Sequence, residues 1–136
     1  MNLNAAKLLC MSMGVEEKDF YRAIQSFTGA SKRLEKIAEN TDTTVYKDFA
    51  HSPSKLKATT EAVKKQFDNR ELIACMELHT FSSLNKEFLK QYEGAMKAAD
   101  KAVVFFSPKA IEHKRLEQLD PAYVLECFAS DNVEVI

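Results

Sequence analysis

The chain has 136 residues, enough for one ordinary domain with a real hydrophobic core. Apolar residues make up 46% of it, which excludes an intrinsically disordered chain. Its 19 basic and 20 acidic side chains give a net charge of -1, which argues against a dominant role in binding nucleic acid or an anionic membrane.

The first part of the sequence has the pattern of two helices. Residues 2–13 place leucine and methionine side chains at helical spacing, and Gly14 suits the position just after a helix. Residues 16–26 begin with acidic side chains, which favour a helix N-terminus, and then carry an apolar stripe. Because the link between the two segments is short, the pattern predicts a helical hairpin.

A turn-prone stretch of small residues follows, and we predict a domain boundary between residues 29 and 30. Residues 33–39 and 43–49 are predicted strands, joined as a hairpin. The second strand leads into a polar turn in which Ser52 is a good N-cap and Pro53 suits the first helical position.

From Ser52 onward, helices and strands alternate. The segment 72–76 is a continuous apolar run, which is typical of a strand covered on both faces. This alternation predicts an α/β domain with a mostly parallel sheet and helices on both faces. The predicted helices are 54–67, 84–99 (with a break near Gly94), 108–114 and 121–128, and the predicted strands are 72–76, 102–106 and 133–136.

The cysteines and the hydropathy pattern bear on location. Cys10, Cys75 and Cys127 are odd in number and widely spaced in apolar surroundings, which favours buried free thiols over a disulfide or a metal site. The sequence shows no apolar run long enough to span a bilayer and no signal-peptide pattern. These features predict a cytoplasmic protein.

Three polar segments follow predicted strands and should meet at the carboxyl edge of the sheet. They are residues 48–52, 77–83 and 107–109. Simpler interpretations remain open. Asp48 could cap a turn, and His51 could be a hydrogen-bonded turn histidine. Helix capping could be the whole role of Ser52 and Ser83. The sequence contains neither G-x-x-x-x-G-K-[ST] nor G-x-G-x-x-G, so neither of these glycine-rich loops holds a nucleotide. The residues alone thus predict an α/β domain with a polar rim.

Three segments carry a resemblance that goes further. Asn2-Leu3-Asn4-Ala5-Ala6 resembles the tail of an H-N-x-x-N-A-x-A-A helix, residues 27–35 (FTGASKRLE) resemble an F-x-G-x-x-R-R-x-E junction, and residues 46–53 (YKDFAHSP) are similar to a D-D-[FY]-[AG]-H-H-P signature. In this order they resemble motifs of the Mur ligase family. Those enzymes use ATP to join amino acids or peptides to UDP-N-acetylmuramate during peptidoglycan synthesis.

The resemblance implies two domains. Residues 1–29 would be the last helices of a central ATPase domain, and residues 30–136 a Rossmann-like, three-layer C-terminal lid domain that is truncated at its end. It also implies an ATP site formed by Asn2, Arg33, Asp48 and His51. In that site Arg33 reaches the phosphates and Asp48 binds the ribose.

The resemblance implies that residues 77–83 contact the incoming amino acid or peptide, with His79, Thr80, Ser82 and Ser83 as the substrate-binding residues. The implied cofactors are ATP and Mg²⁺, held mainly by domains outside this chain, and no catalytic residue or metal ligand is assigned within it. The implied partners are UDP-N-acetylmuramate and a peptide or amino acid. We expect the fragment alone to lack ligase activity and to bind ATP weakly.

The sequence departs from the family patterns at several positions. Lys32 replaces the first junction arginine, Lys47 the first acid of the signature, and Ser52 its second histidine. The loop 77–83 lacks the arginine that both the alanine-adding and the tripeptide-recycling members carry. The general likeness of the sequence favours the recycling type, which attaches L-Ala-γ-D-Glu-meso-diaminopimelate. The alanine-adding type is the alternative.

An alternative from another class is a free-standing, non-catalytic module of the flavodoxin or receiver type. A receiver should open with a strand and an acidic pocket, whereas this chain opens with two predicted helices. The order of the elements therefore favours the ligase interpretation.

Overall fold

The structure is a computed structural model that describes residues 2–27, 29 and 31–136, without the side chain of Asn2. The chain divides into two compact units, residues 1–47 and 48–136. The first contains α1 (Asn2–Ser12), α2 (Glu17–Ile24), β1 (Glu35–Glu39) and β2 (Thr44–Lys47). The second contains α3 (Pro53–Gln66), β3 (Ile73–Leu78), α4 (Lys86–Leu89), the 3₁₀ helix η1 (Lys90–Tyr92), β4 (Lys101–Phe106), α5 (Pro108–His113), α6 (Pro121–Phe128) and β5 (Val133–Val135).

The first unit contains the two predicted hairpins. α1 and α2 are joined through Gly14, whose φ of +89° is a conformation that glycine adopts without strain. β1 and β2 pair in antiparallel fashion, and the side chain of Asn40 accepts hydrogen bonds from the N–H groups of Asp42 (2.9 Å) and Thr43 (2.6 Å) in the turn between them. Residues 28 and 30 lie outside the described residues, and the boundary between 29 and 30 stays a prediction.

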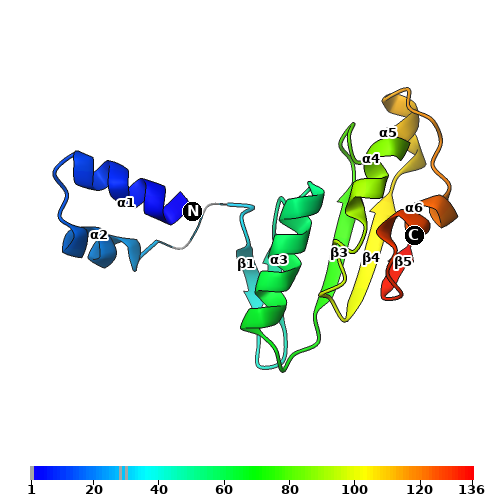
Figure 1. Cartoon of the computed structure of the whole chain (residues 1–136). Helices are drawn as coiled ribbons and strands as arrows, with labels where there is room; N and C mark the ends of the chain where they lie inside the picture. The colour runs from blue at the N-terminus through cyan, green and yellow to red at the C-terminus, as the bar shows by residue number, and fades with distance from the viewer. Residues whose placement is uncertain (1, 28, 30) are drawn as a thin grey trace. The chain divides into compact units, whose positions relative to one another are not determined.

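The second unit is built on a parallel sheet with the strand order β3-β4-β5 (Figure 1). Ile73 pairs with Lys101 across the first strand pair, and Ala102 pairs with Val133 across the second. Helical segments connect the strands along the chain, as parallel pairing requires. The predicted α/β class with a parallel sheet is confirmed.

The core of the second unit lies on one face of this sheet. The even-numbered side chains of β3 and β4 are buried there, except for the partly buried Ala74, together with residues from α3, η1, α5 and α6. The odd-numbered side chains face away, and Ile73 is 58% and Phe105 43% exposed. The predicted strand covered on both faces is therefore wrong for β3, because the helices of the described residues pack against its even-numbered face.

The predicted helix 84–99 is much shorter in the structure. α4 and η1 end at Tyr92, and turns follow as far as β4. Gly94 has a φ of +64°, and its N–H donates to the carbonyl of Phe128 at 2.9 Å instead of continuing a helix. A tertiary contact with the end of α6 therefore overrides the helical pattern.

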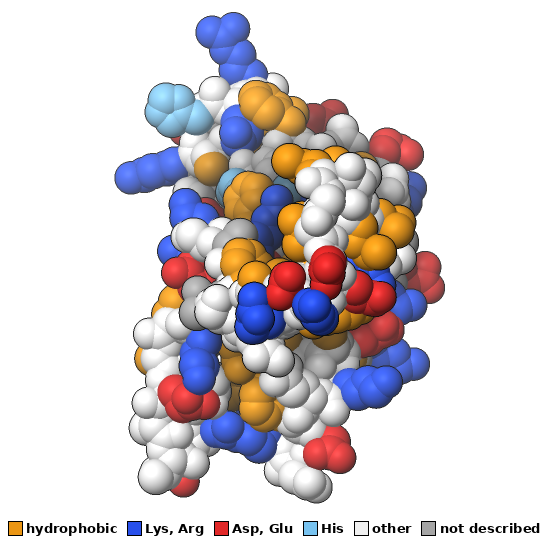
Figure 2. Space-filling model, turned by 90° about the vertical axis from the view of Figure 1, so that its left-hand side faces the viewer, with side chains coloured by type: hydrophobic (Ala, Val, Ile, Leu, Met, Phe, Trp, Pro, Cys, Tyr) orange, Lys and Arg blue, Asp and Glu red, His pale blue; other side chains and the backbone are white. Residues whose placement is uncertain are grey.

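The cysteines are free thiols, as predicted, but their burial differs. Cys127 is buried, whereas Cys75 is exposed on the uncovered face of β3 and Cys10 is half-buried. None of the described helices is long and apolar enough to cross a membrane. On the face drawn in Figure 2, acidic and basic side chains are interspersed, in keeping with the balanced charge of the sequence.

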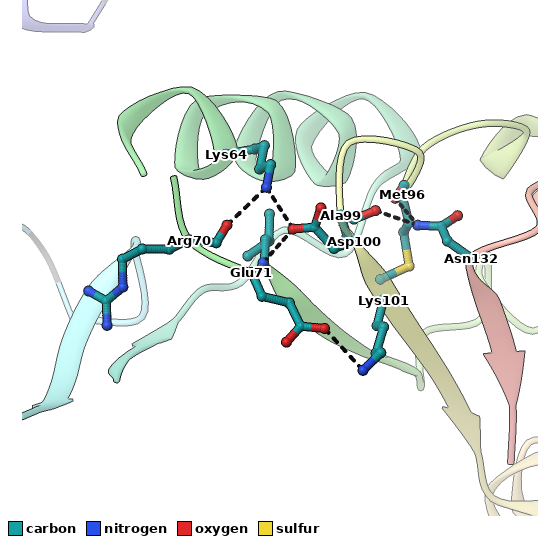
Figure 3. Close-up of polar contacts among 9 residues, drawn as sticks. Lys64, Arg70, Glu71, Met96, Ala99, Asp100, Lys101 and Asn132 are labelled. Atoms are coloured by element: carbon teal, nitrogen blue, oxygen red, sulfur yellow. Dashed lines mark hydrogen bonds and ion pairs between the residues drawn. The ribbon is translucent and has the colours of Figure 1, made fainter. Parts of the chain in front are cut away.

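A polar network joins the N-terminal ends of β3 and β4 to α3 (Figure 3). The carboxylate of Asp100 accepts hydrogen bonds from the N–H of Leu72 (2.6 Å) and from Nζ of Lys64 (2.7 Å). Asn132 donates from Nδ2 to the carbonyls of Met96 (3.1 Å) and Ala99 (2.7 Å). The network fixes the edge of the sheet opposite to the candidate site.

We predict that Asp100→Asn lowers stability mainly above about pH 4. The hydrogen bond from Leu72, followed by that from Lys64, lowers the pKa of Asp100. A carboxylate with a lowered pKa stabilises the fold above its unfolded pKa of about 3.9, and this contribution is lost as the pH falls through the folded pKa. Urea unfolding at pH 7 and pH 3 should show a difference between the two proteins that shrinks at pH 3. A difference that is equal at both values would contradict this.

Candidate functional site

Two of the three polar loops that were predicted to meet lie together in the second unit. We call residues 48–52 the signature loop and residues 77–83 the second loop. The ring of Phe49 lies 4.7 Å from that of His51 within the signature loop and 6.2 Å from that of His79 in the second loop, centroid to centroid. The aromatic contact thus joins the start of α3 to the carboxyl end of β3.

Asp48 is exposed at the beginning of the signature loop, directly after β2 ends at Lys47. Its Oδ2 accepts a hydrogen bond of 2.8 Å from the hydroxyl of Thr59 on α3. Ser52 occupies the N-cap position of α3 with Pro53 behind it, but its hydroxyl makes no capping hydrogen bond. The predicted helix start is confirmed, whereas the capping role of the Ser52 hydroxyl is not found.

His51 is held mainly through its backbone. Its N–H donates to the carbonyl of Phe49 at 3.0 Å, and its Nδ1 lies 3.1 Å from the same oxygen. Its own carbonyl accepts a hydrogen bond from the hydroxyl of Tyr92. The interpretation of a hydrogen-bonded turn histidine therefore fits its contacts, and Tyr92 is a contributor that the sequence did not reveal.

The second loop is organised by Thr80 and Ser83. The Ser83 Oγ accepts hydrogen bonds from the N–H (3.0 Å) and the hydroxyl (2.9 Å) of Thr80, and the N–H of Ser83 donates back to the Thr80 Oγ1 at 3.0 Å. Ser83 is buried, whereas the N-cap of α4 is Asn85, which accepts from the N–H of Phe88. The prediction that Ser83 caps a helix is therefore wrong, because its hydroxyl closes the loop instead.

The other residues at the end of the second loop are half-buried or exposed. His79 is half-buried, with its Nδ1 3.2 Å from the carbonyl of Glu77, and Ser82 is exposed. Phe81 is 63% exposed, and Nζ of Lys114 lies 4.2 Å from the centre of its ring. The sequence placed Lys109 at this rim, whereas the cation over the Phe81 ring is that of Lys114, which follows α5.

The other predicted ATP-binding residues belong to the first unit. Arg33 is exposed between Lys32 and Leu34, whose φ values of 55° and 49° are unusual for residues with a Cβ. The carboxylate of Glu35 holds this turn, because it accepts from the N–H of Lys32 (2.8 Å) and the hydroxyl of Ser31, and these hydrogen bonds lower the pKa of Glu35. Asn2 begins α1, and its side chain lies outside the description.

Metal binding depends on how the donor side chains of the described residues are grouped. No three His, Cys, Asp or Glu side chains of that part of the chain are grouped closely enough to hold a metal ion. Asp48, in contrast, presents a carboxylate suited to accept hydrogen bonds from hydroxyl groups.

A match over most of the chain identifies the family. Residues 32–135 match the family described as Mur ligase, glutamate ligase domain. The chain belongs to the Mur ligase family. A relative, the UDP-N-acetylmuramate--L-alanine ligase of Caldicellulosiruptor bescii, is 37% identical over 103 residues, which cover 76% of this chain and 22% of that protein. The enzyme of the same name from Desulfitobacterium hafniense is 30% identical over 104 residues, 76% of this chain and 23% of the relative. The chain thus spans less than a quarter of these relatives.

Solved structures agree with this Mur ligase fold. The UDP-N-acetylmuramate-alanine ligase of Thermotoga maritima has a TM-score of 0.71 at 18% identity, over 99% of this chain and 28% of that chain. A murein peptide ligase of Psychrobacter arcticus has a TM-score of 0.56 at 21% identity, over 99% and 28%. A folylpolyglutamate synthase of Thermotoga maritima scores 0.59 at 20% identity, over 99% and 30%. Because ligases with different named substrates share the fold, the fold does not identify the substrate.

Proposed function

We propose that this chain provides the ATP-binding lid of a longer ligase that joins an amine to the carboxylate of UDP-N-acetylmuramate. The observation that carries the proposal is the signature loop, which presents Asp48 beside the second loop in a domain of the Mur ligase family. We place the reaction in the cytoplasm, where free thiols such as those of this chain stay reduced.

In this proposal four side chains of the chain contact ATP. The carboxylate of Asp48, braced by the hydroxyl of Thr59, accepts hydrogen bonds from the ribose hydroxyls of ATP. His51 lines the same cleft. Arg33, whose guanidinium carries a permanent positive charge, reaches the phosphates, and Asn2 lies near the adenine.

The proposed reaction needs charge and enclosure more than a protein nucleophile. The carboxylate of UDP-N-acetylmuramate attacks the γ-phosphorus of ATP, which forms an acyl phosphate and releases ADP. The amine then attacks the acyl carbon, and phosphate leaves. Phosphoryl transfer of this kind depends on positioned cations and a closed site, which a lid domain provides when it swings in. Mg²⁺, bound elsewhere in the ligase, would neutralise phosphate charge.

Two amine substrates are candidates. L-Alanine is supported by the names of the curated relatives. The tripeptide L-Ala-γ-D-Glu-meso-diaminopimelate, which the general likeness of the sequence favours, is not named by these relatives and is the alternative to be tested. The second loop, with His79, Thr80, Ser82 and Ser83, would contact either amine. Lys114, which lies over Phe81, would supply a positive charge for a substrate carboxylate beside a loop that has no lysine or arginine of its own.

The test is a coupled assay of a ligase that carries this chain, with ATP, UDP-N-acetylmuramate and one amine at a time. We expect ADP and phosphate to form with only one of L-alanine and the tripeptide. The isolated 136-residue chain is the control and should show no turnover. Failure of both amines to stimulate ADP formation would refute the proposed function, and turnover by the isolated chain would refute its assignment as a lid.

A further inference from the structure

The ring of Tyr92 is fixed in the core of the second unit. Tyr92 ends η1 and its side chain is fully buried. Its ring stacks on Phe128 of α6, with centroids 5.2 Å apart and an angle of 18° between the planes. Phe88 of α4 meets it edge-on at 6.0 Å. Contacts from two helical segments therefore leave the ring little freedom to move.

The hydroxyl at the end of this ring reaches a distant part of the chain. It donates a hydrogen bond of 2.5 Å to the carbonyl of His51, 41 residues away in the sequence. Burial raises the pKa of Tyr92 to about 12, so the hydroxyl remains a donor throughout the neutral pH range. A rigid core residue is thus tied to the backbone of an otherwise polar surface loop.

The signature loop is held at both ends. At its beginning, Asp48 accepts a hydrogen bond from Thr59 on α3. At its end, the carbonyl of His51 accepts the hydrogen bond from Tyr92. The other two His51 contacts, with the carbonyl of Phe49, lie within the loop and cannot fix it to the rest of the unit.

We propose that Tyr92 is a positioning residue for ATP, which fixes the signature loop so that Asp48 and His51 face the nucleotide. The inference rests on the proposed function, because it assumes that this loop binds ATP. Tyr92 itself touches no substrate and acts only through the backbone of His51. Its ring packs in the core, and its hydroxyl bonds the backbone of the signature loop.

The test removes only the hydroxyl, with Tyr92→Phe. Tyr123→Phe is the matched control, because the Tyr123 hydroxyl also donates to a backbone carbonyl, that of Lys86, at 3.1 Å, but away from the signature loop. In the 136-residue chain, hydrogen–deuterium exchange of residues 48–52 should accelerate about three- to tenfold in Tyr92→Phe and remain unchanged in Tyr123→Phe. Equal exchange in both variants would overturn the inference.

The second measurement uses the ligase that carries the chain. Tyr92→Phe should raise the KM for ATP about three- to tenfold, with kcat and the KM for the amine nearly unchanged, whereas Tyr123→Phe should change none of these. Asp48→Asn separates the two proposals. A raised KM for ATP with Asp48→Asn but not with Tyr92→Phe would overturn the role of Tyr92 alone. An unchanged KM with both would overturn the ATP role of the loop as well.

Discussion

Replacing Asp48 by alanine is expected to raise the KM for ATP about ten- to a hundredfold in a ligase that carries this chain, while the fold stays intact. A hydrogen bond to a charged group contributes about 1.5–3 kcal/mol, and each 1.4 kcal/mol is about a factor of ten in affinity. Asp48 is exposed, so its removal leaves no cavity and should change the free energy of unfolding by less than about 1 kcal/mol.

Two further variants make this result specific to Asp48. Asp48→Asn keeps an acceptor for Thr59 and for the ribose but removes the charge, and should give a smaller rise in KM. Asp131→Ala removes another exposed aspartate before β5, at the opposite edge of the sheet, and should leave ATP kinetics unchanged. Unchanged ATP kinetics in Asp48→Ala would refute the assignment of Asp48 to the nucleotide.

The sequence predicted the sheet well because its signals are local. The apolar runs before Glu77 and Ser107 predicted the two strands β3 and β4, although not that one face of β3 is exposed. Pro108 and Pro121 marked the starts of α5 and α6 where the structure has them. The signature loop and the second loop do lie together, but β2, which precedes the signature loop, pairs with β1 in a separate antiparallel sheet. The rule that loops share the carboxyl edge of one parallel sheet therefore does not account for this contact.

The failures share a physical cause, which is competition between local and distant partners. Ser83 has the sequence context of a helix cap, but Asn85 caps α4 and Ser83 bonds Thr80 instead. Similarly, the helical pattern of residues 84–99 gives way at Gly94, whose N–H bonds the end of α6. One sequence cannot rank such alternatives, because the winning contact depends on how the elements pack.

Two contributors to the site could not be found from sequence spacing. Tyr92 lies in an apolar stripe, which predicts an ordinary core residue, and its ring is one. Its hydroxyl meets the carbonyl of His51, 41 residues away, only through tertiary packing. Lys114 directly follows α5 and is not singled out by the sequence, but its Nζ lies over the ring of Phe81. Both contacts follow from tertiary packing and leave no periodic signal in the sequence.

Phe128→Ala is expected to cause the largest loss of stability among these variants, about 3–5 kcal/mol of the free energy of unfolding of the second unit. Phe128 is fully buried, stacks on Tyr92 and accepts the Gly94 hydrogen bond through its backbone. Its truncation therefore leaves a cavity against the ring of Tyr92, whose hydroxyl bonds the signature loop. Because domains are stable by only about 5–15 kcal/mol, such a loss is a large share of the total.

Urea unfolding followed by near-ultraviolet circular dichroism, which reports on packed tyrosine rings, would measure this loss. Phe81→Ala is the matched control, because the Phe81 ring is 63% exposed and its removal should cost less than about 1 kcal/mol. Phe128→Ala should also speed hydrogen exchange in residues 48–52, since a loosened Tyr92 ring no longer presents its hydroxyl to His51. An equal loss of unfolding free energy in Phe128→Ala and Phe81→Ala would show that the packing of Phe128 does not stabilise the second unit. It would also contradict the proposed support of the signature loop by the packed Tyr92 ring.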